Sequence, residues 1–184
     1  MKFFLIFLSM SIISLYLLAD ENNNNENNIE YKMKAVFVFN FTKYIQWPDN
    51  DTSETFEIAI IGNSNIINPL KEIAKNKLIN KKKIKIISCK DIQDINIPHI
   101  LFISTSEKKN LDKILQKVKN KNILTISDSK EFANKGVTIN FVIVKGKIKF
   151  EINTHAIEST GLQISSQLLK LAILVQEKGE QSND

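Results

Sequence analysis

Cysteine is nearly absent from this 184-residue chain, in which Cys89 is the only one. A single cysteine excludes an intramolecular disulfide. Because Cys89 ends an apolar segment, we expect it to be a buried small apolar residue, and an intermolecular bridge is the alternative. No cysteine follows the apolar run at the N-terminus, which argues against a lipoprotein.

Glycine is also scarce, and the motifs that need it are missing. One of the five glycines, Gly62, follows an apolar segment, the position at which doubly wound folds bind phosphates. The sequence there, G-N-S-N, lacks the G-x-G-x-x-G fingerprint of dinucleotide sites. The G-x-S-x-G turn of serine hydrolases does not occur either. These absences disfavour nucleotide binding and offer no candidate nucleophile.

Residues that could hold a metal or transfer a proton are few. The two histidines, His99 and His155, have no cysteine or carboxylate at ligand spacing. The run Ser127-Asp128-Ser129 has the composition of a turn and helix cap. Three further carboxylates show no sign of pairing: Asp91, Asp94 and Glu151. We therefore expect no metal, no cofactor, no catalytic residue and no enzyme activity.

Charge gives little information about partners. The formal net charge is +5, and lysine, asparagine and isoleucine are all abundant, which indicates a general compositional bias. The cluster Lys81-Lys82-Lys83 is more typical of solvated turn charges than of a nucleic-acid surface. No nucleic-acid partner is expected.

The N-terminus has the pattern of an export signal. Lys2 is followed by an apolar run that ends at Ala19, so residues 1–19 are predicted to be a signal peptide. A retained membrane anchor is the alternative, since the run is near the spanning minimum of about 17 residues and Leu17 suits cleavage poorly. The polar tract over residues 20–28 predicts a disordered linker. We expect a periplasmic domain over residues 29–178 and a flexible tail over residues 179–184, with no membrane span after cleavage.

Residues 29–47 fit either a helix or a strand. The run A-V-F-V-F favours a strand by propensity. The helical alternative gathers apolar residues on one long face and leaves Ala35, Val38 and Phe39 on a second side. We prefer the helix and expect Trp47-Pro48 to end it, with Trp47 as a core residue in preference to a ligand platform.

The middle of the chain alternates between strand and helix signals. Strands are predicted at 56–61, 83–88, 99–104 and 123–126, with a short helix or turn around Glu131-Phe132. Helices are predicted from an Asn68-Pro69 cap to about Ile79 and from Ser106 to Val118. This alternation predicts a three-layer, Rossmann-like α/β domain with a mostly parallel sheet.

The stretch from Gly136 to Val175 predicts a hairpin and then a helix. Residues 138–145 and 147–152 alternate with the period of a strand, and Lys145-Gly146 suits the tight turn between them. Asn153 is a candidate helix N-cap. Beyond Gly161 the apolar residues occupy two sides of a predicted long helix, so both sides need cover.

Four blocks in this chain resemble the YfiR/HmsC-like family of bacterial periplasmic proteins. They follow one another in the family's order over nearly the whole domain: K-A-x-x-x-x-N-F-x-K-Y-x-x-W-P at 34–48, H-I-L-F-I-S at 99–104, L-T-I-S-D at 124–128, and F-E-I-N…G-L-x-I-S-S-x-L-L-x-L-A at 150–172.

The resemblance implies a regulatory binding protein. Such a protein represses an inner-membrane diguanylate cyclase by contacting its periplasmic sensor domain, and so lowers cyclic-di-GMP and affects biofilm formation. Two alternatives remain: a periplasmic small-molecule binding domain without a cyclase partner, with its pocket beyond Gly62 and Ser104, and an exported hydrolase whose site is unrecognised.

Self-association is the last expectation from the sequence. The two predicted helices have more apolar circumference than one sheet face covers, which favours a symmetric homodimer. Packing of the two helices against each other within one chain is the alternative. The candidate self-association residues are Val38, Phe39, Ile164, Leu168, Leu171 and Val175.

Overall fold

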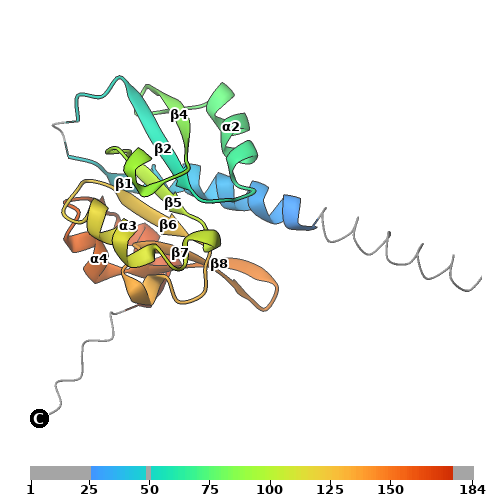
Figure 1. Cartoon of the computed structure of the whole chain (residues 1–184). Coiled ribbons are helices and arrows are strands. Elements are labelled where there is room, and N and C mark those ends of the chain that lie inside the picture. The colour runs from blue at the N-terminus through green and yellow to red at the C-terminus, as the bar shows by residue number, and fades with distance from the viewer. Residues whose placement is uncertain (1–25, 49–50, 176–184) are drawn as a thin grey trace, which may run out of the picture.

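The computed structural model describes residues 26–48 and 51–175, which form a mixed α/β fold (Figure 1). Its main sheet has eight strands in the order β10-β8-β7-β6-β5-β2-β4-β3. The strand bounds are β2 (Thr55–Ile61), β3 (Leu78–Ile79), β4 (Lys82–Cys89), β5 (Ile100–Ile103), β6 (Leu124–Ser127), β7 (Ile139–Val144), β8 (Lys147–Asn153) and β10 (Ile173–Val175).

The centre of the sheet is parallel, as predicted. Strands β4, β2, β5, β6 and β7 pair in parallel with their neighbours in that order. Numbered along the chain, these five strands have the order 2-1-3-4-5 of flavodoxin-like doubly wound folds. The β7–β8 pair is antiparallel and completes the predicted C-terminal hairpin.

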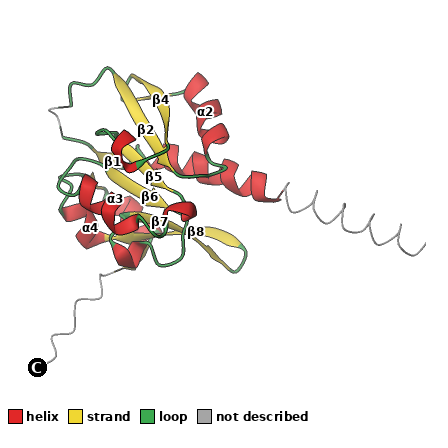
Figure 2. Cartoon of the chain, viewed as in Figure 1, coloured by secondary structure: helices red, strands yellow, loops and turns green. Residues whose placement is uncertain are grey.

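Helices cover both faces of the sheet, giving three layers (Figure 2). One face packs against a helix at residues 26–41, α2 (Ile67–Asn76) and two short helices, α4 (Thr154–Glu158) and α5 (Ser166–Leu171). The other face packs against α3 (Leu111–Val118) and the residues flanking two 3₁₀ turns, η1 (Ile92–Asp94) and η3 (Ala133–Lys135). Strand β5 is buried on both faces, which explains its uninterrupted apolar sequence.

The hairpin turn and the following cap are confirmed. Lys145 and Gly146 both have positive φ, 50° and 70°, as a two-residue turn of this hand requires. The Asn153 side chain accepts the backbone N–H of Ala156 at 2.9 Å, so Asn153 caps α4. Cys89 is buried and free at the end of β4, also as predicted.

The N-terminal helix is confirmed in type but shorter than predicted. Residues 26–41 are helical, a turn follows, and β1 (Ile45–Gln46) precedes an extended Trp47-Pro48. The helix therefore ends before the proline, where the Thr42 hydroxyl donates to the carbonyl of Phe39 at 2.6 Å. Residues 26–28 were predicted to be linker and are helical. Residues 20–25 and the predicted signal peptide lie outside the described residues.

The predicted long C-terminal helix is wrong. This segment forms β9 (Gln163–Ile164), the six-residue α5 and then β10. The Ser165 hydroxyl caps α5 by accepting the N–H of Leu168 at 3.3 Å. The apolar residues 173–175 continue as a strand because β10 pairs in parallel with β8.

Two predicted helix starts are also wrong. Helix α2 begins at Ile67, before the predicted Asn68-Pro69 cap, and ends at Asn76, because residues 78–79 pair with β4 as β3. The predicted helix from Ser106 begins as a 3₁₀ turn, η2 (Thr105–Glu107), capped by Ser104, before α3 starts at Leu111.

Candidate functional site

At the crevice where doubly wound folds bind ligands, the loops after β2 and β5 contact each other, and a hollow of about 370 Å³ remains beside Gly62, Asn63 and Ser64. This crevice lies beyond the carboxyl ends of β2 and β5. The Ser106 hydroxyl accepts the N–H of Asn63 at 3.1 Å, and the Ser104 hydroxyl donates to the Asn63 carbonyl. A Cβ atom at Gly62 would collide with the Ser106 hydroxyl and with Glu107. The two loops therefore touch where a phosphate would enter.

A polar cluster at the opposite, amino-terminal end of β5 involves His99. Asp51 Oδ2 lies 2.9 Å from His99 Nε2 and 2.6 Å from Lys82 Nζ. Ser53 Oγ donates to Asp51 Oδ1 at 2.6 Å and lies 3.2 Å from His99 Nε2. The imidazole is 8% exposed and stacks on Phe56, with ring centroids 4.2 Å apart. Serine, histidine and aspartate are thus assembled in one place.

The hydrogen-bond pattern of this cluster differs from that of a catalytic triad. His99 Nδ1 accepts the backbone N–H of Glu57 at 3.0 Å, so the proton of the neutral ring resides on Nε2. That Nε2–H donates to Asp51, so it does not accept a proton from Ser53. In a triad the carboxylate orients Nδ1 and leaves Nε2 as the base. The cluster instead anchors residues 51–53 to β4 and β5.

The Asp51 carboxylate is stabilised as an anion. Burial alone raises the pKa of Asp51, but hydrogen bonds from Lys82, Ser53 and His99 outweigh it and hold that pKa well below its usual value. Asp51 is therefore a permanent acceptor, which suits a structural tie better than acid–base exchange.

A second ionic cluster joins the N-terminal helix to the loop after β6. Lys34 Nζ lies 2.7 Å from Asp128 Oδ2 and 2.6 Å from Glu30 Oε1, and it sits 4.6 Å from the centroid of the Tyr31 ring. Burial lowers the pKa of Lys34, but the hydrogen bonds that its ammonium donates to Asp128 and Glu30 outweigh this effect and raise that pKa. Burial also raises the pKa of Tyr31, and the negative charge of Asp128 adds to the effect. Lys34 thus stays charged between two carboxylates.

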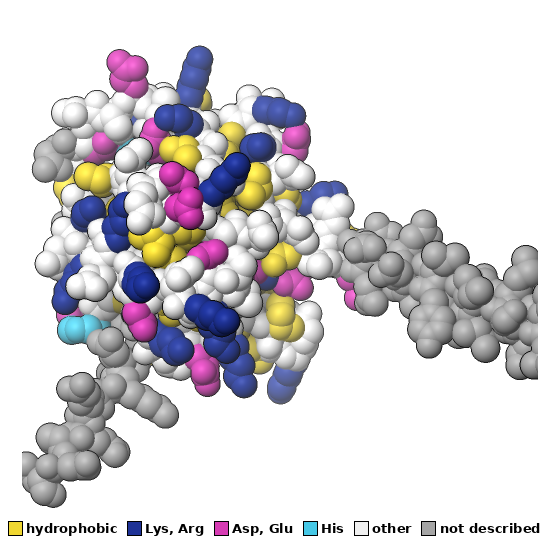
Figure 3. All heavy atoms as spheres, viewed as in Figure 1, with side chains coloured by type: hydrophobic (Ala, Val, Ile, Leu, Met, Phe, Trp, Pro, Cys, Tyr) yellow, Lys and Arg dark blue, Asp and Glu magenta, His cyan; other side chains and the backbone are white. Residues whose placement is uncertain are grey.

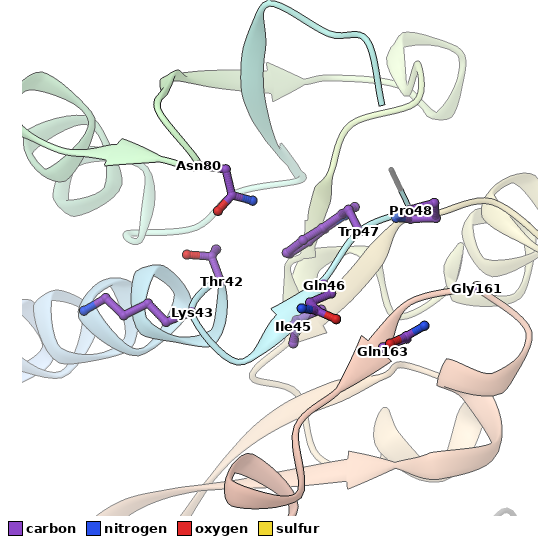
Figure 4. Close-up of a pocket in the computed structure, with 9 residues that line it drawn as sticks. All are labelled: Thr42, Lys43, Ile45, Gln46, Trp47, Pro48, Asn80, Gly161 and Gln163. Atoms are coloured by element: carbon purple, nitrogen blue, oxygen red, sulfur yellow. The ribbon is translucent and has the colours of Figure 1, made fainter. Parts of the chain in front are cut away.

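A cavity of about 520 Å³ lies beside Trp47 (Figure 4). It is bounded by the end of the N-terminal helix, by the two-stranded ribbon of β1 and β9, and by the turn between β3 and β4. Its lining residues are Thr42, Lys43, Ile45, Gln46, Trp47, Pro48, Asn80, Gly161 and Gln163. Trp47 is half-buried, and its indole N–H donates to the His99 carbonyl at 3.3 Å.

The predicted self-association residues do not form one exposed surface. Val38 and Leu168 are 1% and 2% exposed and lie in the same core cluster, against which Phe39 and Ile164 pack. Leu171 is 67% exposed, and Val175 is half-buried in the edge strand β10. Packing of the helices within one chain, which was the alternative to a dimer, therefore explains why Val38 and Leu168 are buried.

Other apolar side chains are exposed on the N-terminal helix. Ile29, Met33 and Val36 are 57%, 49% and 51% exposed, and their spacing places them on one helix face. A shallow hollow of about 370 Å³ is lined by Lys32, Met33, Val36, Phe37 and Asn40. On the face of the molecule in Figure 3, basic and acidic side chains are interspersed over the surface.

Sequence reasoning missed both ionic clusters. Asp51 had no pattern that could identify it, since its partners come from other strands. Lys34 and Asp128 did carry a signal, because they stand in two of the blocks on which the family resemblance rests. Among the residues that the structure describes, no group of three or more histidine, cysteine or carboxylate side chains could hold a metal ion.

The four sequence blocks meet in the fold. Lys34 of the first block pairs with Asp128 of the third in chain order, and Trp47 of the first contacts His99 of the second. The first and last blocks join where β1 pairs with β9, Ile45 opposite Ile164. The blocks are thus a set of contacts that hold the N-terminal segment against the sheet.

These features define a three-layer α/β domain whose assembled polar clusters tie its segments together. The YfiR/HmsC-like family model matches residues 31–173, most of the chain, and the protein belongs to this family. The family is regulatory rather than catalytic, and it suggests periplasmic regulation of diguanylate cyclase signalling. No curated protein gives a significant match. Within the described part of the chain, every helix is too short or too polar to cross a membrane.

Proposed function

We propose that this protein is a periplasmic repressor of an inner-membrane diguanylate cyclase, which it contacts through the periplasmic sensor domain of that enzyme. The observation that carries the proposal is the family match over residues 31–173, which includes every contact between the four blocks. Repression lowers cyclic-di-GMP in the cytoplasm and so reduces biofilm formation. The protein itself turns over no nucleotide. The close approach of Ser106 and Glu107 to Gly62, where a phosphate would bind in a doubly wound fold, supports this part of the proposal.

Deletion of the gene in its own host tests the proposal. Cyclic-di-GMP, measured by mass spectrometry, should rise in the deletion strain and return to its original level when the full-length chain is restored. The matched control is a strain that also lacks the cyclase, in which the deletion should have no effect. Unchanged cyclic-di-GMP under conditions in which the protein is expressed would contradict repression.

Direct contact needs a separate experiment. The tagged protein should recover a membrane-anchored cyclase from solubilised membranes. It should not recover a cyclase variant that lacks the periplasmic domain from membranes prepared in the same way. Recovery that is equal with and without that domain would place the contact elsewhere.

Export is part of the same proposal. Residues 1–19 act as a cleaved signal, so the mature chain begins near Asp20. Mass spectrometry of the periplasmic fraction should find this N-terminus. An intact chain that still contains Met1 in the cytosolic fraction would contradict export.

Self-association is also proposed, as a symmetric homodimer. The exposed face of the N-terminal helix, formed by Ile29, Met33 and Val36, supports this better than the buried Val38 and Leu168 do. One patch can satisfy both copies in a two-fold contact. Burying a large apolar side chain contributes about 1.5–3 kcal/mol, so three per chain offset a substantial part of the cost of association.

A further inference from the structure

The cavity beside Trp47 combines an aromatic ring with uncharged polar groups. The carboxamides of Gln46, Asn80 and Gln163 all line it, and all three residues are exposed. No hydrogen bond engages these amides within the described residues, so their donors and acceptors face solvent. The Thr42 hydroxyl adds a further acceptor, since its own proton is given to the Phe39 carbonyl.

The charged end of Lys43 points away from this cavity. Of the described residues that line it, Lys43 alone is ionisable, but the Lys43 ammonium donates to Asn40 Oδ1 at 2.9 Å and lies 5.1 Å from the Phe39 ring centroid. Figure 4 shows the lysine side chain extending away from Trp47, so its aliphatic stem lines the cavity. Among the described lining residues, a phosphate or carboxylate ligand would meet only this engaged ammonium, and a cationic ligand would meet no carboxylate.

The tryptophan is held in one orientation. Its indole N–H is bonded to the His99 carbonyl, and its ring meets Phe56 edge-to-face, with centroids 5.0 Å apart and planes at 86°. Figure 4 shows the ring nearly edge-on, with Asn80 beyond one face and Gln46 beyond the other. The electron-rich face of an indole attracts the weakly positive C–H groups of a sugar ring. Carboxamides both donate to and accept from sugar hydroxyls.

We propose that this cavity binds a short neutral saccharide, stacked on the face of Trp47 toward Gln46 and hydrogen-bonded by Gln46 and Gln163 (Figure 4). Its volume, about 520 Å³, falls in the range of about 300–1,000 Å³ that small-molecule sites occupy. An apolar ligand on this face would cover the Gln46 and Gln163 amides without satisfying them, and a charged ligand would meet no counter-ion among the described lining residues. The site is independent of cyclase repression, because either activity can be present without the other.

The chain contains one tryptophan, so tryptophan fluorescence, excited selectively over tyrosine, reports on this cavity alone. The protein, produced from its full-length sequence, is titrated with tetra-N-acetylchitotetraose and with cellotetraose as neutral probes. Tri-galacturonate is the charged probe, and an uncharged Gly-Ser peptide tests for peptide binding. Saturation-transfer NMR on the same samples detects binding that leaves the emission unchanged. We expect a saturable response to at least one neutral saccharide at concentrations up to about 10 mM, the weak end of specific binding.

Two variants assign the response to the amides. Gln46→Ala with Gln163→Ala removes exposed side chains from the β1–β9 ribbon and should weaken binding about tenfold, since each lost hydrogen bond contributes modestly. Gln167→Ala, an exposed glutamine on α5, is the matched control and should bind as the unmodified protein does. Equal melting temperatures establish that the variants are folded. The proposal is overturned if both methods detect no neutral saccharide, if the charged probe or the peptide binds more tightly, or if the double variant binds equally well.

Discussion

Lys34 and Asp128 form an ion pair across 94 positions of sequence, with Nζ 2.7 Å from Oδ2 and side chains 5% and 6% exposed. The lysine comes from the N-terminal helix, and the aspartate follows β6. A buried pair adds little stability over an apolar replacement of both partners, but removing one partner leaves an uncompensated charge. The pair therefore specifies the position of the N-terminal helix on the sheet.

Substitution of Lys34 should destabilise the fold. Lys34→Met leaves Asp128 without its cation, and we expect the free energy of unfolding to fall by about 3 kcal/mol. Urea denaturation measures the change. Lys43→Met, at an exposed lysine in the turn that follows the same helix, is the control and should change the free energy of unfolding by less than about 0.5 kcal/mol. The double variant Lys34→Met with Asp128→Leu should recover much of the loss, and equal losses for Lys34→Met and Lys43→Met would contradict a structural role for the pair.

The Asp51 cluster should make stability depend on pH at the acid end. The pKa of Asp51 is lower in the folded chain than its ordinary value of 3.8. Ionised Asp51 therefore stabilises the fold at pH values above the pKa that it has in the unfolded chain. That contribution declines as pH falls below 3.8 and is lost once pH passes below the folded pKa. Asp51→Asn lacks the contribution at every pH. The difference in unfolding free energy between the two proteins should be full at neutral pH and shrink in acid, and a difference independent of pH would contradict this assignment.

Two glycines with positive φ should respond differently to alanine. Gly62 and Gly146 have φ of 82° and 70°, so Ala costs each about 1–2 kcal/mol of backbone strain. At Gly146 nothing lies within 4 Å of the added Cβ, whereas at Gly62 it meets Ser106 and Glu107. Thermal unfolding should therefore show at least twice the loss of stability for Gly62→Ala. Equal losses would mean that the loops after β2 and β5 separate easily, and the crevice would be open to ligands.

The proposed dimer can be tested on the N-terminal helix. Val36→Asp places a charge in the exposed apolar face and should convert the dimer to a monomer at micromolar concentration, as measured by light scattering. Ile97→Asp is the control, because Ile97 is 66% exposed and lies in the loop before β5. A monomeric unmodified protein across the concentration range would refute the dimer, as would dissociation of both variants alike.

Local signals predicted the hairpin and its neighbours well. The turn at Lys145-Gly146 and the cap at Asn153 depend on residues within a few positions, so sequence reasoning could identify both. The order of strands along the chain was also predictable, because β5 and the second half of β2, residues 58–61, are buried on both faces and form continuous apolar runs. Local information was sufficient for these elements.

Non-local pairing explains the failures. The apolar residues after Gly161 have helical spacing, but Ile173 pairs with Glu151 of β8 and Ile164 pairs with Ile45 of β1. Those partners lie elsewhere in the sequence, and they override the local preference. The Asp51–His99 contact and the cavity beside Trp47 are non-local in the same way, so neither could be predicted from spacing.

The pairing of β1 with β9 also sets when the chain can fold. The N-terminal helix packs on residues from β7 and β8, and β1, the strand that follows it, pairs with β9 near residue 164. A chain synthesised from its N-terminus therefore exposes its first helix until its last third has emerged. Contacts between distant segments also slow folding, because a long loop must close first. Until then the helix and β1 lack the partners that hold them in the folded domain, so the N-terminal segment is the last to be fixed in place.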